Sequence, residues 1–128
     1  MTDIHYVLAS TVLTWVMLFA APAIRNREWT MEGMKLGFGN RDKLPEPSPM
    51  AARADRAAKN MLENMVLFVA AFAAMRAAGK SDATGPAIFF FARVAYWIVY
   101  LIGIPYLRTL LWVVSIAGIG MMGLAAIR

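Results

Sequence analysis

The chain has 128 residues, 60% of them hydrophobic, and its mean hydropathy is +0.56. Soluble domains are about 45–50% apolar, so this composition indicates a membrane protein. The net charge of +5 does not indicate nucleic-acid binding, because the basic residues cluster beside hydrophobic spans. The absence of cysteine excludes disulfides, a thiolate nucleophile and a thiolate metal site. The single histidine, His5, gives no support for a histidine-based metal site.

Residues 4–24 are predicted to form a first membrane-spanning helix. They contain no Asp, Glu, Lys or Arg and are long enough to cross a hydrocarbon core. A cleaved signal peptide is the alternative. It fits poorly because Asp3, and no basic segment, precedes the apolar run.

Residues 25–49 are polar and are predicted to form one long irregular loop. Gly37 and Gly39 are expected to break any helix there, and Pro45, Pro47 and Pro49 favour extended backbone. At the start of this loop lie two cations, Arg25 and Arg27, which either reach lipid headgroups or enter a site between helices.

Three further spans are predicted over residues 52–78, 85–104 and 108–127. Pro105 is expected to end the third span, and Arg108 to open the fourth. Gly118, Gly120 and Gly123 are interpreted as small residues for helix packing. The fold class is therefore an all-α integral membrane bundle of four helices, in one domain over residues 1–128.

The distribution of basic residues predicts the orientation in the membrane. The long loop and the start of the second helix hold most of them: Arg25, Arg27, Lys35, Arg41, Lys43, Arg53, Arg56 and Lys59. The positive-inside rule then makes this loop cytosolic and places both termini outside.

Polar residues inside two spans are the feature that points to function. One helical face of the second span carries Arg56, Lys59, Asn60 and Glu63, and one face of the third carries Arg93, Tyr96 and Tyr100. A charge facing lipid costs about 2.5–3.5 kcal/mol. These groups are therefore expected to face one another or a wet cavity.

A purely structural network, with Glu63 paired to Arg93 or Lys59, is one interpretation of this set. However, the cations outnumber the single carboxylate, since Asp55 is expected on a different face. A cationic pocket without its own counter-charge favours a ligand with more carboxylates than amines.

Three motifs resemble the MAPEG family, the membrane-associated proteins in eicosanoid and glutathione metabolism. They are Arg56-x-x-x-Asn60-x-x-Glu63, Arg93-x-x-Tyr96-x-x-x-Tyr100, and Arg108 after Pro105. The resemblance covers nearly the whole chain. The segment 37–42 is more typical of bacterial relatives, which would place the protein in a bacterial inner membrane.

The resemblance implies a homotrimer that binds glutathione between subunits as a co-substrate. Family positions then assign glutathione contacts to Arg56, Lys59, Asn60, Glu63, Arg93, Tyr96 and Tyr100, with Arg25 or Arg27 from the first helix. Arg108 would stabilise the glutathione thiolate, and Asn64 stands where some members have an aromatic residue.

The function implied is a membrane glutathione transferase, or a related peroxidase, acting on apolar electrophiles from the bilayer. Two alternatives come from other classes of protein. One is a small transporter that uses Glu63, and the other is a non-enzymatic protein that binds anionic lipid through its basic loop.

Overall fold

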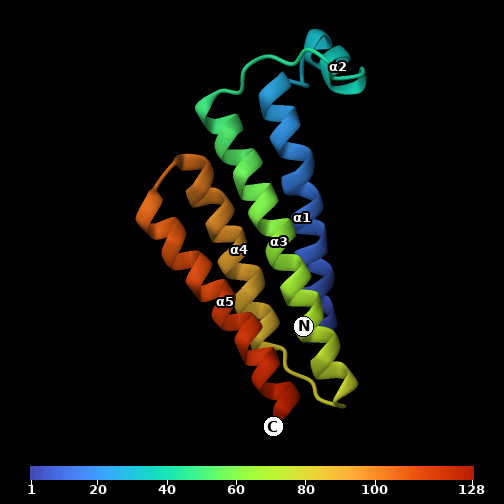
Figure 1. Ribbon diagram of the computed structural model, residues 1–128, viewed down its shortest axis with the longest axis vertical. Coiled ribbons are helices and arrows are strands. Elements are labelled where there is room, and N and C mark those ends of the chain that lie inside the picture. The colour runs from blue at the N-terminus through green and yellow to red at the C-terminus, as the bar shows by residue number, and fades with distance from the viewer.

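Five helices and no strand make up the chain, described here over residues 1–128 from a computed structural model. They are α1 (Asp3–Asn26), α2 (Met31–Phe38), α3 (Pro49–Ala77), α4 (Thr84–Ile102) and α5 (Pro105–Ile127). The four long helices form one elongated bundle, with α2 at one end and both termini at the other (Figure 1). We call these the loop end and the terminal end.

The four long helices have the length and hydropathy of membrane spans. They are 19 to 29 residues long, and leucine, valine, phenylalanine and tryptophan side chains are exposed along them. Apolar side chains on the outside of a bundle suit a lipid environment. The prediction of an all-helical integral membrane bundle is confirmed.

The prediction of an entirely irregular loop over residues 25–49 is wrong, because α2 lies within it. The Thr30 side chain accepts a hydrogen bond from the Gly33 amide at 2.9 Å and caps this helix. A Cβ atom on Gly33 would collide with the backbone carbonyl of Arg27. This glycine therefore permits close packing of α2 on the end of α1. Of the two glycines expected to break a helix, Gly37 lies within α2 and does not break it, whereas Gly39 caps its end.

Two prolines begin helices. Pro105 is the first residue of α5, and Pro49 is the first residue of α3. The expectation that Pro105 ends the third span is wrong: α4 ends at Ile102, and Gly103 caps it with a φ of 93°. Proline suits the first helical position because a backbone N–H at that position would have no partner within the helix, so its absence costs nothing. Arg108 consequently lies in the first turn of α5.

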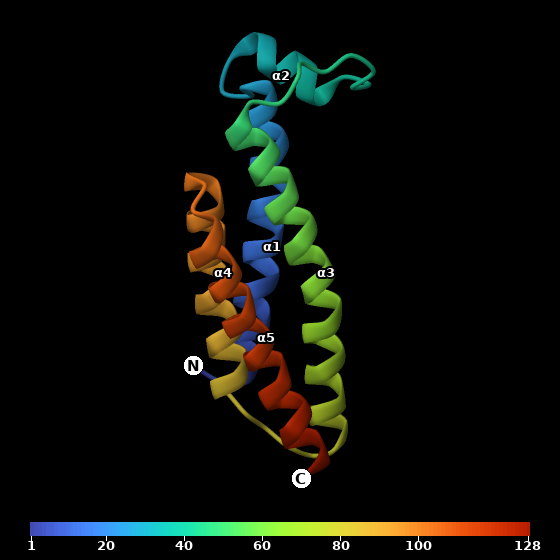
Figure 2. The same cartoon turned by 60° about the vertical axis from the view of Figure 1, so that its left-hand side comes forward.

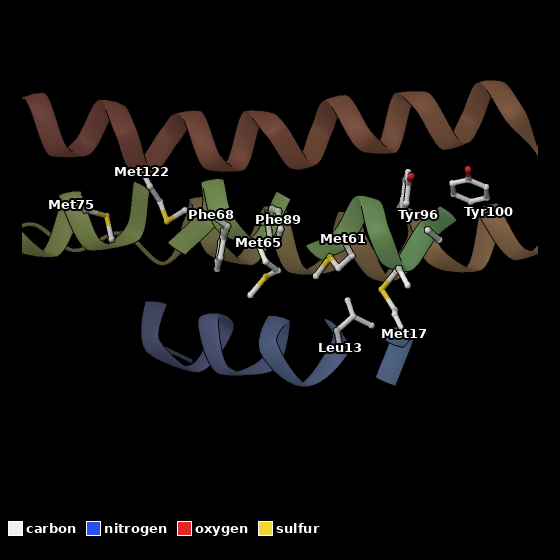
Figure 3. Close-up of a cluster of buried hydrophobic side chains, with 12 residues drawn as sticks. Leu13, Met17, Met61, Met65, Phe68, Met75, Phe89, Tyr96, Tyr100 and Met122 are labelled. Carbon is white, nitrogen blue, oxygen red and sulfur yellow. The ribbon is translucent and has the colours of Figure 1, made fainter. Parts of the chain in front are cut away.

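The core is rich in methionine and runs along α3 between the other long helices (Figure 3). Phe68 and Phe89 stack at its centre, with ring centroids 4.2 Å apart. Gly118 meets Gly85 where α4 and α5 cross, whereas Gly120 and Gly123 have no neighbour within 4 Å of an added Cβ. Of the three predicted packing glycines, only Gly118 packs inside the protomer.

A buried carboxylate joins three segments at the terminal end. Asp3, only 2% exposed, accepts hydrogen bonds from Arg76 Nη1 at 3.2 Å and from the Ser81 hydroxyl at 3.0 Å. This network ties the start of α1 to the end of α3 and to the link that follows.

Candidate functional site

Arg93 is the centre of a polar network inside the bundle. Its side chain is fully buried, and Nη2 donates to Asn60 Oδ1 at 2.8 Å while Nε donates to Met61 Sδ at 3.2 Å. Its guanidinium carbon lies 4.1 Å from the centre of the Tyr96 ring, a cation–π contact. Its Nη1 has no partner. This cation is held by neutral groups alone, so its charge is not neutralised within the protomer.

Asn60 is oriented by a second residue of α3. Asn64 is buried, and its Nδ2 donates to Asn60 Oδ1 at 3.2 Å and to the Asn60 carbonyl at 2.9 Å. With the Asn60 oxygen accepting from both Asn64 and Arg93, the Asn60 amide nitrogen remains free to donate. Asn64 therefore acts as a positioning residue for Asn60.

A pocket of about 270 Å³ opens beside this network. Its wall consists of Asn60, Tyr96, Tyr100, Arg108, Thr109 and Trp112, from α3, α4 and α5. The hydroxyls of Tyr96 and Tyr100 point toward α5 (Figure 3). The structure thus brings the polar faces of the second and third spans together and adds the first two turns of the fourth.

Tyr100 lies between two cations. Arg56 Nε donates to its hydroxyl at 3.2 Å, and the Arg108 guanidinium lies 4.7 Å from its ring centre. No carboxylate forms an ion pair with Arg56, Arg93 or Arg108. The pocket therefore has a surplus of positive charge, which favours an anionic ligand.

Lys59 and Glu63 do not enter this pocket. Lys59 pairs with Asp55 at 2.9 Å, so the expectation that Asp55 lies apart from the stripe is wrong; the i, i+4 spacing brings the two together. Glu63 is exposed and pairs with neither Arg93 nor Lys59. Both side chains point outward because they occupy the side of α3 that no other helix of the protomer covers.

Arg25 and Arg27 occupy different surroundings. Arg25 is half-buried, donates from Nε to the Pro45 carbonyl at 3.0 Å, and lines a pocket of about 380 Å³ that Arg41 and Arg56 also line. Arg27 is exposed in a left-handed conformation at the end of α1. Of the two candidates, Arg25 is the one that shares a pocket with Arg56.

Sequence reasoning missed four residues near the site. Thr109, Trp112 and Arg41 line the two pockets, and Arg53 donates two hydrogen bonds, at 3.2 and 3.0 Å, to the Leu101 carbonyl at the end of α4. Helical spacing from Arg108 was a signal for Trp112, at i+4. No local signal marks Arg53, whose partner Leu101 is 48 positions away in the chain. Arg41 has a local hydrogen bond to Gly37, but only the fold brings it into a pocket with residues of α1 and α3.

The chain is thus an integral membrane protein whose polar, cationic pocket lies between three of its membrane-spanning helices. The chain belongs to the MAPEG family, whose model matches residues 4–128, nearly the whole chain. No curated protein and no solved structure matches it.

Proposed function

We propose that this protein binds glutathione in the cationic pocket and transfers its thiolate to apolar electrophiles that arrive from the bilayer. Family membership supports a glutathione-associated role. The observation that carries the proposal is the group of three arginines, Arg56, Arg93 and Arg108, gathered around Tyr96 and Tyr100 without a counter-charge.

The chemistry of the pocket fits glutathione, which carries two carboxylates, one amine and one thiol. Arginine binds carboxylates through charge-assisted hydrogen bonds, and Arg93 Nη1 is a buried donor without a partner. Glu63 lies outside the pocket wall, on the exposed side of α3, and is a carboxylate without an ion pair that suits the ligand's amine where the ligand extends past the pocket. We assign a weaker contact to Lys59, because it is paired with Asp55 and its ammonium lacks the planar, two-pronged donor geometry of arginine.

In this mechanism Arg108 acts on the thiol. A guanidinium beside the sulfur favours the thiolate, which is the nucleophile, and the thiol proton passes to water. The sulfur lone pair then forms a bond to the electrophilic carbon as the leaving group departs or as a double bond opens. Tyr96 and Tyr100 supply hydroxyl donors to the peptide, and their rings exclude lipid.

The site is completed in an assembly of identical chains. Arg56, Lys59 and Glu63 are exposed on one side of α3 inside a span, and charges of this kind are costly in lipid. A neighbouring copy covers this stripe, in a homotrimer as the family suggests, and brings its own Arg25 toward the ligand. The loop end faces the cytosol and the termini lie outside, as the basic residues indicate.

Glutathione titration into detergent-purified protein by calorimetry tests the proposal. We expect saturable binding in the parent protein and at least about tenfold weaker binding for Arg56→Ala and Glu63→Gln, the loss of one charged contact each. Lys80→Ala removes a cation at the terminal end and serves as the matched control, with affinity unchanged. Absence of binding in the parent protein would refute the transferase, and binding that survives both substitutions would refute the residue assignment alone.

A further inference from the structure

The short helix α2 carries an exposed apolar face. Phe38 is 79% exposed, Met31 74% and Met34 42%, and Trp29, just before the helix, is 67% exposed. Met31, Met34 and Phe38 fall at i, i+3 and i+7, so they form one stripe on the helix. We call these three residues the α2 stripe; Trp29 precedes it in the chain. Large apolar side chains grouped in this way mark an interaction surface.

The orientation of α2 on the bundle is set by close packing on its other side. Gly33 lies against the backbone of Asn26 and Arg27, and Gly37 lies against the Glu28 carboxylate. Arg41 Nε donates to the Gly37 carbonyl at 2.8 Å and holds the far end of the helix. The stripe is therefore held in position and is not a loose loop.

The level of α2 along the bundle matches a membrane surface. The apolar run from Ile4 to Ile24 is about 30 Å long at 1.5 Å per residue, the thickness of a hydrocarbon core. α2 begins only a few residues after α1 ends, and it runs across the end of the bundle (Figure 2). It lies where hydrocarbon gives way to headgroups.

The charges around the stripe suit lipid phosphate. Lys35, Arg41 and Lys43 are all exposed, and Lys35 is adjacent to the stripe on the helix. Three acidic residues of this segment are exposed as well: Glu32, Asp42 and Glu46. Glu32 lies about 100° round the helix from Met31, so a cation and not a carboxylate borders the apolar side chains.

We propose that α2 is an interfacial helix, which inserts the α2 stripe into the surface of the bilayer and places Lys35 on lipid phosphates. An apolar face with aromatic residues, bordered by basic side chains, is the composition of helices that lie in the membrane plane. Tryptophan next to such a face is favoured at the headgroup level. This role is independent of glutathione binding and anchors the loop end to the membrane.

The absence of cysteine from the chain permits a direct test. Phe38→Cys and Met31→Cys place an environment-sensitive fluorophore on the stripe, and Glu32→Cys places the same fluorophore on another face as the matched control. In nanodiscs of phosphatidylcholine with phosphatidylglycerol, we expect nitroxide-labelled lipid to quench the two stripe probes several-fold more than the Glu32 probe. Acrylamide, a neutral quencher in water, should give the reverse order.

Two results would overturn the proposal. Stripe probes that acrylamide quenches as strongly as the Glu32 probe would mean that the stripe faces water. If neither nitroxide-labelled lipid nor acrylamide quenches the stripe probes, then protein, such as a second copy of the chain, covers the α2 stripe. Lys35→Glu in the Phe38→Cys background should reduce quenching by lipid, and no change there would refute the phosphate contact.

Discussion

At the scale of single residues, the charges in the span have two different roles. Arg93 is enclosed by Asn60, Met61 and Tyr96, so it organises the bundle, and its Nη1 is a buried donor without a partner. Arg108 is half-buried, and its guanidinium carbon lies 4.7 Å from the centre of the Tyr100 ring. Substitution of the first should therefore affect folding, and substitution of the second should affect chemistry.

We expect Arg93→Met to lower the free energy of unfolding in detergent by about 1–3 kcal/mol, because Asn60 Oδ1 loses its charged partner inside the bundle. Arg128→Met, at the exposed end of the chain, should leave it unchanged. The measurement is denaturation by titration with sodium dodecyl sulfate, followed by circular dichroism. Equal stability of the two variants would show that the buried network contributes nothing.

We expect Arg108→Ala to retain glutathione binding but to lose the ultraviolet absorbance of the bound thiolate, with turnover about 100-fold slower, the usual cost of a lost charge-stabilising group. Difference absorbance and calorimetry on the same samples separate the two effects. Lys80→Ala is the control for removal of one positive charge. A thiolate signal that persists in Arg108→Ala would contradict the role assigned to Arg108.

At the scale of helices, close approach of backbones holds α4 against α5. Gly85 and Gly118 face each other so closely that a Cβ on Gly118 would lie 2.6 Å from the Gly85 carbonyl oxygen and 2.9 Å from the Phe89 nitrogen. These are backbone atoms, which cannot move aside as a flexible side chain can. The pocket depends on this crossing, because both tyrosines project from α4 and Arg108 from α5.

Gly118→Ala should therefore destabilise the protein by about 1–3 kcal/mol through overpacking. Gly120→Ala is the matched control two residues away, where an added Cβ meets nothing within 4 Å. For Gly120→Ala we expect no loss of stability, and a gain of up to about 1 kcal/mol in the free energy of unfolding, because alanine gives the unfolded chain less backbone freedom than glycine. Thermal unfolding of both variants in one detergent checks this, and equal shifts would rule out the close contact.

At the scale of the whole molecule, the isolated protomer leaves charges of α3 uncovered in the membrane. Arg56, Lys59 and Glu63 are exposed beside the apolar Leu62 and Val66. A mixed surface of this kind suits contact with protein better than contact with lipid. The pocket opens near this surface, so assembly and ligand binding should be linked.

We expect the purified protein to have three times the 14.1 kDa mass of one chain when light scattering is corrected for bound detergent. Addition of glutathione should raise the detergent concentration needed to dissociate the assembly, because a ligand bound between copies stabilises them. A mass of a single chain under mild detergent would contradict an intersubunit site.

The four membrane spans could be predicted from hydropathy alone. The free energy of placing a segment in lipid is the sum of the contributions of its own residues, so it does not depend on which other segment the helix packs against. The same cost made Arg56, Glu63 and Arg93 stand out as functional candidates. The motif spacing also led to the family that the whole-chain match confirms.

Only the tertiary structure decided which of those residues meet. The contacts of Arg93 with Asn60 and of Arg56 with Tyr100 join residues of α4 and α3 that are 33 and 44 positions apart in the chain. Lys59 and Glu63 share a helical face with Arg56 yet point outward, and α2 forms across two glycines. Spacing along a helix gives the face of a residue, whereas the neighbour it meets depends on how the helices cross, and the sequence pattern does not specify that geometry.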